Sequence, residues 1–250
     1  MEITGVNNSL VKETVKLQQK KYRVDSGKFL LEGYKSVYES FYSGIELESV
    51  FVLKEKAEKY KFLKRELILT TEAVLKKIST TDSAPEVVAV GFQPKPDYER
   101  LKKAKKVILL ENISDAGNLG TIIRSAAAFN IDALVLYGNT VDLYNPKCVR
   151  STVGNLWKVD VFHIKDLTEL QTYFDSYERV ATLPKSDNSI WLKDWTPKGK
   201  ILLMFGSEAD GLSDELKNYA TLNLTIEMNK EVESLNLSTS ASIVMYVLAE

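Results

Sequence analysis

The sequence predicts an α/β protein made of two units, each a sheet covered by helices. Short apolar runs alternate with segments of helical periodicity along the chain. This alternation is typical of a mostly parallel sheet flanked by helices. The 250 residues, 44% hydrophobic and 27% charged, suffice for one large or two small domains.

A pair of prolines in Gln93-Pro94-Lys95-Pro96-Asp97 separates the two predicted units. We place a smaller α/β domain at residues 1–95 and a second domain at residues 104–250. The strands expected in the first domain are 29–31, 50–53, 67–70 and 87–90. Those expected in the second are 107–110, 133–137, 180–183, 201–205 and 222–226, with a further β-like run at 159–164.

Composition excludes several classes of protein. No apolar stretch approaches the roughly 18 to 20 residues of a membrane helix, and the N-terminus lacks a signal-peptide pattern, so we expect a soluble cytoplasmic protein. Cys148 and His163 are the only cysteine and histidine, which excludes disulfides within the chain, His/Cys metal clusters and, almost as firmly, histidine triads. We expect no metal and a structural role for both residues. The net charge of −1 does not identify a polyanionic partner.

A basic stripe marks the helix predicted at about 9–24. Lys12, Lys16, Lys20 and Arg23 follow one another at spacings of four, four and three residues. One interpretation is an ordinary solvated helix face. The other is a stripe that contacts the phosphates of a nucleic acid.

The first of three polar junctions follows the apolar strand at 107–110. Asn118 is the predicted N-cap of a helix whose buried stripe includes Leu119, Ile122 and Ile123. Arg124 projects from another face of that helix, beside small residues. Taken alone, such an arginine is more often a surface ion-pair partner than a catalytic group.

The second junction follows the strand at 201–205. Gly206 and Gly211 have the spacing of a phosphate-binding loop, but Leu212 replaces the required lysine, and the chain has no G-x-G-x-x-G segment. Walker and dinucleotide-binding sites are therefore excluded. Glu208 is placed to be a site carboxylate or a turn-stabilising acid, and Ser213 is the predicted cap of the next helix.

The third junction, at 226–242, leads into an apolar C-terminal helix that runs through Leu248. Its serines and threonines suit helix capping and, equally, a polar ligand. In open α/β sheets, ligands bind at the carboxyl edge of the strands. By physical argument alone, the sequence predicts a ligand cleft of unassigned function at that edge.

Taken together, the three junctions resemble the three motifs of the SpoU-like (TrmH-type) RNA 2′-O-ribose methyltransferases of the SPOUT superfamily. The residues that carry the resemblance are Asn118 with Arg124, Gly-Ser-Glu at 206–208 and Ser-Leu-Asn at 234–236. Segments 9–12, 20–23 and 29–33 resemble the small substrate-binding domain that precedes the catalytic domain in many members, so the resemblance covers nearly the whole chain.

The resemblance implies a knotted SPOUT (α/β-knot) catalytic domain, with a trefoil knot in its C-terminal part, and a smaller N-terminal α/β RNA-binding domain. It also implies a homodimer and S-adenosylmethionine as cofactor. The adenosyl pocket would involve Gly206, Ile226 and Leu235, largely through backbone groups and close packing on the adenine.

The catalytic positions that the resemblance implies are Asn118, Arg124, Glu208, Ser234 and Asn236. A guanidinium is a poor base, so Arg124 would stabilise charge that develops on the ribose 2′ oxygen and position phosphate. Glu208 and Asn118 would orient Arg124 or the loop backbone. Ser234 and Asn236 would shape the third loop and contact the substrate or the methionyl end of the cofactor.

Three features remain open at this stage. Arg150 would contact RNA phosphate or, equally, form an interface or surface ion pair. Ala116 and Glu227 stand where the family usually has proline, so the shape of the cofactor loop depends on other contacts. The expected activity is 2′-O-methylation of structured RNA, ribosomal RNA before transfer RNA. The alternative is a non-catalytic RNA-binding or ribosome-assembly protein with the same fold.

Overall fold

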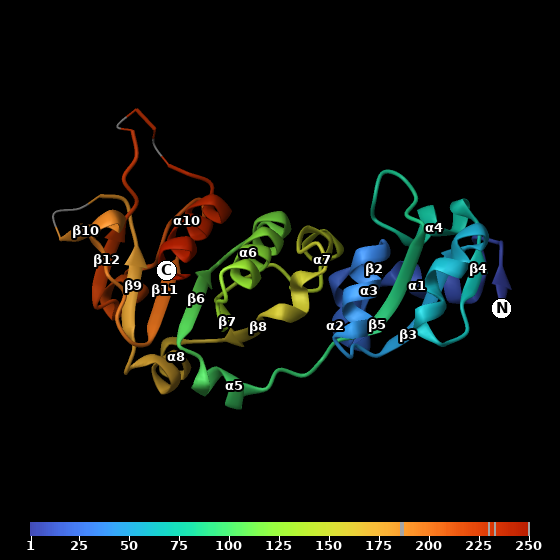
Figure 1. The fold of residues 1–250 in the computed structure, drawn as a ribbon, viewed down its shortest axis with the longest axis horizontal. Helices are drawn as coiled ribbons and strands as arrows, with labels where there is room; N and C mark the ends of the chain where they lie inside the picture. The colour runs from blue at the N-terminus through green and yellow to red at the C-terminus, as the bar shows by residue number, and fades with distance from the viewer. Residues whose placement is uncertain (186–187, 230, 233, 250) are drawn as a thin grey trace. The chain divides into compact units, whose positions relative to one another are not determined.

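The computed structural model describes residues 1–185, 188–229, 231–232 and 234–249, and its chain divides into two compact units (Figure 1). One unit comprises Met1–Lys95 and Asp142–Trp157, and the other comprises Pro96–Val141 and the chain from Lys158 onward. The strands are β1 Glu2–Ile3, β2 Lys28–Glu32, β3 Leu47–Leu53, β4 Ile68–Thr70, β5 Val87–Phe92, β6 Lys106–Glu111, β7 Ala133–Tyr137, β8 Asp160–Ile164, β9 Glu178–Thr182, β10 Ser189–Trp191, β11 Ile201–Phe205 and β12 Leu222–Thr225. The α-helices are α1 Ser9–Lys16, α2 Lys20–Ser26, α3 Tyr34–Tyr42, α4 Glu72–Ile78, α5 Tyr98–Lys103, α6 Ala116–Ala128, α7 Pro146–Ser151, α8 Leu167–Phe174, α9 Asp214–Tyr219 and α10 Leu237–Ala249. The described residues also include three 3₁₀ helices: η1 Lys54–Leu63, η2 Asn155–Lys158 and η3 Leu192–Asp194.

The first unit contains a mixed sheet of five strands in the order β1-β4-β3-β5-β2. Strand β5 runs antiparallel to both β3 and β2, whereas β1, β4 and β3 are parallel. Helices α1 and α4 cover one face, where Val11 and Leu75 pack on Phe51 in a buried apolar cluster. All four predicted strands of this unit are confirmed, and the two-residue edge strand β1 is an addition.

The predicted helix at 9–24 is wrong in its extent, because the chain breaks at residues 17–19 into α1 and α2. The side-chain amide of Gln18 donates to the carbonyl oxygens of Lys77, Ile78 and Ser79 at the end of α4 (3.1, 3.2 and 3.0 Å). These bonds satisfy carbonyls that a helix end leaves without partners, and they hold residue 18 outside a continuous helix.

The break also removes Arg23 from the predicted basic stripe. Arg23 is only 2% exposed, its Nη1 donates to the carbonyl of Leu17 (2.8 Å), and its Nε and Nη2 contact a carboxylate oxygen of Asp142 at 2.7 and 2.5 Å. A buried guanidinium requires such partners, because burying an unpaired charge is costly. Arg23 therefore stabilises the first unit and does not face solvent.

Residues Asp142–Trp157 leave the second unit after β7, pack in the first unit and return to β8. The sequence placed them in the second domain, at 104–250, whereas the division between Lys95 and Pro96 falls at the predicted boundary. Their contacts include Arg150 Nη1 to Glu32 Oε2 (2.6 Å) and Trp157 Nε1 to Ser40 Oγ (2.7 Å). The Glu32 side chain is 1% exposed, so Arg150 serves as its counter-ion.

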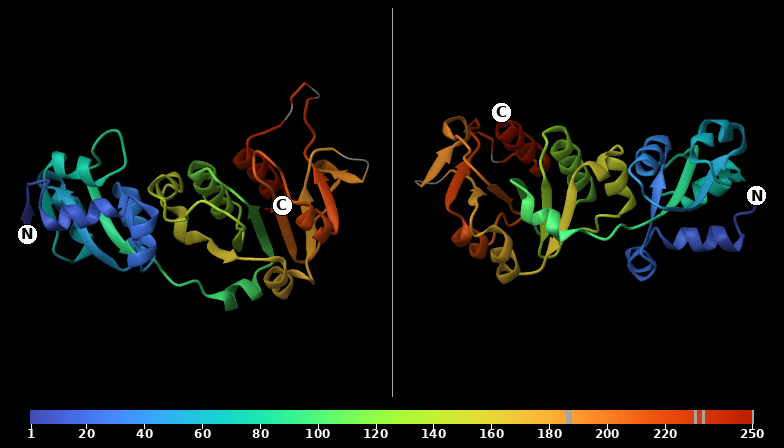
Figure 2. Two further views of the ribbon diagram at one scale, coloured as in Figure 1. Left: turned by 180° about the vertical axis from the view of Figure 1, so that it is seen from behind. Right: turned by 60° about the horizontal axis from the view of Figure 1, so that its bottom comes forward.

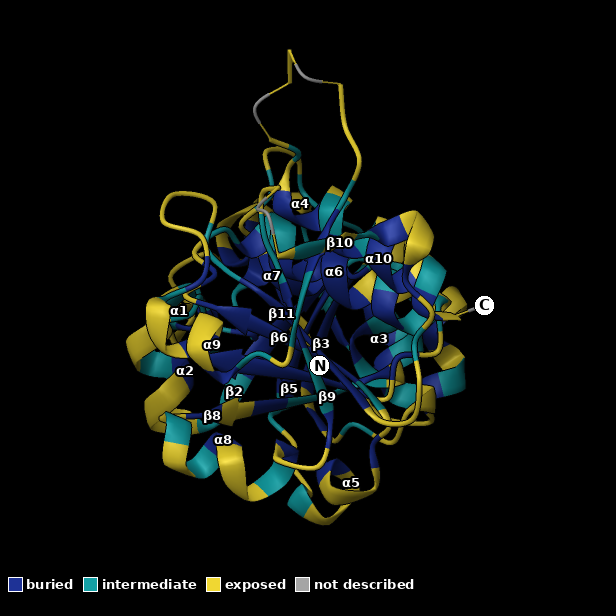
Figure 3. Cartoon of the chain, turned by 90° about the vertical axis from the view of Figure 1, so that its left-hand side faces the viewer, coloured by how far each residue is buried: buried dark blue, intermediate teal, exposed yellow. Residues whose placement is uncertain are grey.

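Among its described residues, the second unit contains a seven-stranded sheet in which every pairing is parallel, in the order β10-β12-β9-β11-β6-β7-β8. This confirms the predicted parallel α/β architecture. Alternate strand residues, such as Val107 and Leu109 of β6, pack against α5, α8 and α9 on one face. Figure 1 draws α6 and α10 on the side of the strands away from α5 and α8, and the turned view of Figure 2 agrees. The strands are buried between these layers (Figure 3).

The order of strands reverses at the centre of this sheet. After β6, β7 and β8 are laid side by side in one direction, the chain crosses to the other side for β9 and then inserts β11 between β9 and β6. A reversal of this kind leaves a crevice at the carboxyl ends of the two central strands, where open α/β sheets bind ligands. The switch point of the second unit is therefore the β6–β11 pair.

Two properties of the described residues concern membranes and metals. None of the helices described is both long enough and apolar enough to span a bilayer. Among the same residues, no group of three or more histidine, cysteine, aspartate and glutamate side chains is arranged to hold a metal ion.

Removing the carboxylate beside Arg23 is expected to destabilise the protein strongly. Asp142→Asn leaves a buried guanidinium without its counter-ion, which typically costs about 3–5 kcal/mol. The measurement is urea unfolding of the full chain. Glu13→Gln is the control, since it breaks the exposed Glu13–Lys16 pair (66% and 44% exposed), which is worth at most about 1 kcal/mol. Equal effects of the two changes would show that the Arg23 pair has no special role.

Candidate active site

Three loops leave the carboxyl edge of the parallel sheet and carry the three sequence motifs. The first loop follows β6, the second follows β11 and the third follows β12. Strands β6 and β11 are neighbours in register, with Leu110 opposite Phe205, so the first two loops start side by side. The third starts two strands away from β11, because β9 lies between β11 and β12.

The N-cap of α6 is Asp115 and not Asn118, which corrects the sequence prediction. An Asp115 carboxylate oxygen accepts a hydrogen bond from the backbone N–H of Asn118 (2.8 Å). Aspartate is a favoured cap that also complements the positive end of the helix dipole. Asn118 is thus the third residue of α6, and its side chain is available for contacts with the other loops.

The Asn118 side chain links all three motifs through hydrogen bonds. Its Nδ2 donates to Oε1 of Glu208 in the second loop at 2.5 Å. Its Oδ1 accepts from Nδ2 of Asn236 in the third loop at 3.1 Å. The structure therefore brings three of the five predicted catalytic residues, Asn118, Glu208 and Asn236, into one chain of contacts.

Asn236 has a second task at the start of α10. Its Oδ1 accepts hydrogen bonds from the backbone N–H groups of Ser238 (2.9 Å) and Thr239 (3.3 Å) and from the Ser238 hydroxyl (2.6 Å). The capping predicted from the Ser/Thr-rich start of this helix is made by the asparagine before it. The amide of Asn236 thus faces the site while its oxygen fixes the helix.

Gly206 lies where two backbone segments touch. Ser207 and Gly211 form an isolated antiparallel bridge, which closes a tight turn that leaves Glu208 exposed. A Cβ atom at Gly206 would lie 1.9 Å from the carbonyl carbon of Gly211. Only glycine permits this approach, so the turn that presents Glu208 depends on Gly206.

Glu111, whose role the sequence analysis missed, fixes the far end of the same turn. This residue ends β6, is 4% exposed, and accepts a hydrogen bond from the backbone N–H of Ser213 at 2.7 Å. Ser213 is the N-cap of α9, as predicted, and its hydroxyl accepts from Leu216 N (3.3 Å). An acidic residue at the end of an otherwise apolar strand is the signal that could have identified Glu111.

A second acid at this edge belongs to α9. The hydroxyl of Tyr137, at the end of β7, donates to Oε1 of Glu215 at 2.5 Å. Burial raises the pKa of the Tyr137 hydroxyl, and the hydrogen bond to the carboxylate raises that pKa further. Tyr137 therefore stays protonated at neutral pH and acts as a hydrogen-bond donor.

Two predicted catalytic residues lie outside the Asn118 chain of contacts. Arg124 is exposed on α6 and makes no ion pair or side-chain hydrogen bond with the residues that the structure describes. At 100° per residue it lies about 120° around the helix from Asn118. Ser234 is also exposed, with no hydrogen bond to that part of the chain.

The predicted cofactor residues fit an adenine by their surface character. Ile226 follows β12, Leu235 precedes α10, and both are partly exposed at the carboxyl edge, as is Gly206 after β11. Partly exposed aliphatic side chains can pack on the faces of a planar base, while backbone groups serve its polar edge. Glu227, which departs from the family pattern, pairs with Lys193 (2.8 Å). Met228 is 37% exposed beside it.

The predicted RNA-binding residues divide into two groups. Lys12 and Lys20 are exposed, and Lys16 is partly exposed and pairs with Glu13 (2.7 Å). Arg23 and Arg150 have carboxylate partners inside the first unit. Of the two roles expected for Arg150, the structure shows the ion pair, with Glu32 as its partner.

Comparison with solved structures gives the class of protein to which this fold and site belong. The AdoMet-bound rRNA methyltransferase from Sinorhizobium meliloti superposes with a TM-score of 0.86 over 99% of this chain and 96% of that chain, at 25% identity. The fold is thus that of the SpoU-type methyltransferases, with a further domain at the N-terminus.

The chain belongs to the SpoU rRNA Methylase family, whose model matches residues 105–246. Residues 8–89 match the MRM3-like substrate binding domain. Among curated proteins, the chain is 29% identical to the 23S rRNA (guanosine(2553)-2'-O)-methyltransferase RlmP of Bacillus subtilis (strain 168), over 99% of this chain and 98% of that protein. It is 25% identical to the 23S rRNA (uridine(2479)-2'-O)-methyltransferase of Streptomyces viridochromogenes, over 98% and 90%. The resemblance inferred from the motifs is confirmed.

Adding a methyl group at Gly206 is expected to open the second loop. Gly206→Ala forces backbone apart, since the new Cβ would meet the carbonyl of Gly211, and such overpacking typically costs about 1–3 kcal/mol. Amide hydrogen exchange at Ser207 and Gly211 measures the loss of their bridge. Gly5→Ala is the matched control, because a Cβ there has no neighbour within 4 Å. Unchanged protection in Gly206→Ala would refute the close-approach argument.

Proposed function

We propose that this protein transfers the methyl group of S-adenosylmethionine to a ribose 2′-hydroxyl of ribosomal RNA. The observation that carries the proposal is the Glu208–Asn118–Asn236 chain of hydrogen bonds, which joins the three family motifs at the switch point of the sheet. The two relatives named above, both called 23S rRNA 2'-O-methyltransferases, align with at least nine tenths of this chain. They support ribosomal RNA as the substrate class.

The chemistry requires orientation and electrostatic stabilisation more than acid–base groups. The cofactor, when bound, supplies an electrophilic methyl group on a sulfonium. The protein must align the 2′ oxygen with that methyl group and stabilise the charge that develops on this oxygen as its proton leaves to solvent water. Asn118 and Glu208 hold the first two loops in a fixed relation, which serves the alignment.

Arg124 is the group that we assign to charge stabilisation. A guanidinium stays positive at any physiological pH, so it can face an oxyanion or a phosphate without first gaining a proton. Its exposed side chain is available to an incoming polyanion. Ser234, also exposed, is assigned to substrate contact in the third loop.

We also propose that the site is completed in a homodimer and that the third loop belongs to a trefoil knot. Arg124 lies on a different face of α6 from Asn118, which fits a site made by two copies. Ile243 and Tyr246 of α10 are 37% and 55% exposed and offer apolar surface on the helix that packs beside α6.

The packing of α10 against α6, which returns the end of the chain to the first motif, supports the knot (Figure 1). The proposed site of action is the cytoplasm.

The direct test is methyl transfer from labelled S-adenosylmethionine to separate pools of unmodified ribosomal and transfer RNA. Digestion and mass spectrometry identify the modified nucleoside. A 2′-O-methylnucleoside from the ribosomal pool is expected. Methylation of transfer RNA alone would show that the substrate class is transfer RNA and not ribosomal RNA. No transfer to either pool, together with no cofactor binding by calorimetry, would favour a non-catalytic RNA-binding protein.

Replacing Arg124 is expected to lower turnover without loss of the cofactor. Arg124→Ala should reduce kcat about 100-fold or more, which is typical for removal of one group that stabilises a developing anion. The Kd for S-adenosylmethionine, measured by calorimetry, should change by less than threefold. Arg100→Ala, in the same unit, is the control, because it removes another exposed arginine, one that pairs with Asp160. Wild-type turnover in Arg124→Ala would refute the assignment.

A charge on the exposed face of α10 is expected to separate the proposed dimer. Tyr246→Lys should yield a monomer by light scattering and abolish methyl transfer, since a buried lysine without a partner opposes association. Val6→Lys, at a residue of the first unit that is 39% exposed and has no assigned role, should leave both properties unchanged. A wild-type protein that stays monomeric at assay concentration would exclude the shared site.

A further inference from the structure

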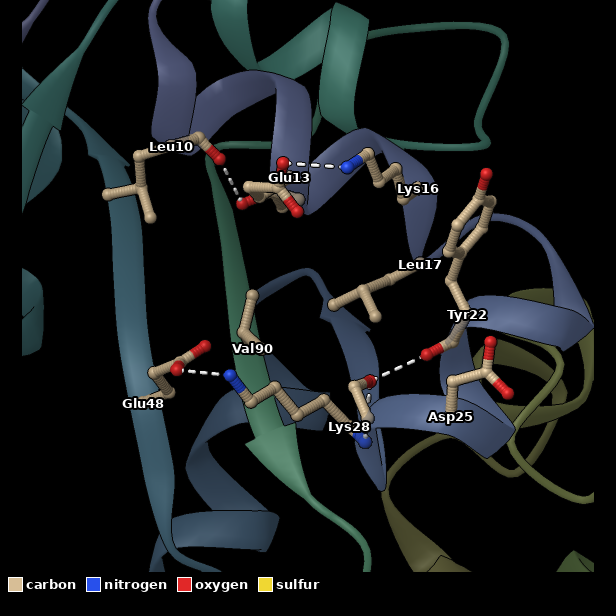
Figure 4. A pocket seen from close by; sticks show the side chains of 11 residues that line it. Leu10, Glu13, Lys16, Leu17, Tyr22, Asp25, Lys28, Glu48 and Val90 are labelled. Carbon is tan, nitrogen blue, oxygen red and sulfur yellow. Dashed lines mark hydrogen bonds and ion pairs between the residues drawn. The ribbon is translucent and has the colours of Figure 1, made fainter.

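A hollow in the first unit is lined by none of the residues assigned to catalysis. It has a cavity volume of about 210 Å³ and lies between α1, α2 and the strands β2, β3 and β5 (Figure 4). This volume lies below the roughly 300–1,000 Å³ of drug-sized ligand sites, so the hollow suits a group no larger than a single ring system. Eleven side chains line it, among them Leu17, Tyr22, Asp25, Lys28, Glu48 and Val90.

The hollow has an apolar floor between two ion pairs. Leu10, Leu17 and Val90 provide the apolar surface, and the last two are 6% and 2% exposed. Figure 4 shows the Glu13–Lys16 pair on one side of them and the Glu48–Lys28 pair on the other. Both lysines are therefore already neutralised by carboxylates. A flat apolar ring with polar edges matches this arrangement better than a phosphate does.

Asp25 is the one carboxylate of the hollow that has no counter-ion among the residues that the structure describes. Within the described part of the chain, Asp25 forms no ion pair or side-chain hydrogen bond. It lies three residues after Tyr22 on α2, so the carboxylate and the aromatic ring share one face of the helix. The lining as a whole carries three carboxylates against two ammonium groups, so it favours a ligand edge that donates hydrogen bonds.

We propose that this hollow binds one unpaired nucleobase of the RNA substrate and prefers guanine. This inference rests on the proposed function, because it assumes that the protein binds RNA. Proteins read RNA mainly at unpaired bases, which they stack on aromatic side chains and hydrogen-bond along the Watson–Crick edge. Tyr22 and the apolar floor contact the faces of the base, and the Asp25 carboxylate reads its edge.

The preference for guanine follows from the pattern of donors. Guanine presents N1–H and an N2 amino hydrogen side by side, which match the two oxygens of one carboxylate. Adenine presents its amino group beside an acceptor nitrogen, and uracil presents one N–H between two carbonyl oxygens. A carboxylate makes one hydrogen bond to either of these bases and meets repulsion from the neighbouring acceptor.

The backbone of the same RNA has cationic groups near the rim. Lys12 lies one turn before Lys16 on α1, and Lys20 and Lys21 directly precede Tyr22. The side chains of Lys12, Lys20 and Lys21 are exposed. They are placed to contact the phosphates that flank a base in the hollow. Of the basic stripe predicted from the sequence, Lys12 and Lys20 are assigned to RNA phosphates beside this base site. Arg23 is not assigned to RNA contact, because it is buried.

The test is fluorescence anisotropy of the full-length protein with 5′-labelled pentanucleotides UUGUU, UUIUU, UUAUU and UUUUU at low salt. We expect UUGUU to bind about fivefold or more tightly than UUAUU and UUUUU, the lower end of the discrimination given by a two-bond base contact. Inosine keeps N1–H and lacks the 2-amino group, so UUIUU should bind with intermediate affinity. Asp25→Asn should bring the four affinities within twofold of one another. Tyr22→Leu should weaken binding of all four.

Asp82→Asn is the matched control, since Asp82 is an exposed aspartate of the same unit outside the hollow. Its preference for guanine should equal that of the wild type. Equal affinities of the wild type for all four oligonucleotides, or a guanine preference that survives Asp25→Asn, would overturn the proposal. Methyl transfer is measured separately: activity without base preference refutes only the base site, and base preference without activity refutes only the proposed methyl transfer.

Discussion

The parallel pairing of β6 with β11 is the constraint on which the site depends. These strands are almost a hundred residues apart in the chain, yet each residue from Lys106 to Leu110 has a partner in β11. Because parallel neighbours end at the same edge, the loops after Glu111 and Phe205 start side by side and on one surface. The contact between Asn118 and Glu208 follows from that register. A slip of one residue would turn the alternating side chains of β11 to the other face of the sheet.

Buried charge has a comparable role in the first unit. Arg23 and Glu32 are both almost fully buried, and each finds its counter-ion, Asp142 or Arg150, in the segment that the chain sends out between β7 and β8. In each pair, both charged side chains must be present, since burial of either charge without its partner would be strongly unfavourable. Aromatic contacts further stabilise the packing of this segment: the Phe29 ring contacts Tyr144 and Trp157, with ring centroids 4.9 and 5.7 Å apart. The segment is thereby fixed to the strand β2, although a division by sequence alone gives it to the other domain.

What could be predicted from the sequence was local or carried by the joint spacing of motifs. Apolar runs located the principal strands, because a strand buried on both faces must be apolar throughout. The motifs identified the family. The structure differs where a partner lies far along the chain: the helix break at Gln18 depends on carbonyls about sixty residues away, and the burial of Arg23 depends on Asp142. Helical periodicity does not predict contacts with partners so far along the chain. The cap of α6 is a different case, because Asp115 stands three residues before Asn118 and is itself a preferred capping residue.

The choice of asparagine at position 118 has a chemical reason. One side chain must donate to the Glu208 carboxylate and accept from the Asn236 amide, and a primary amide does both from adjacent atoms. Aspartate would set two carboxylates against each other, and leucine would leave both partners without a bond. Asn236 has the same property, since it donates to Asn118 while its oxygen caps α10. The two amides therefore transmit the position of the second loop to the start of the last helix. Order in any one of the three loops stabilises the other two, which suits a site that has to hold two substrates in line.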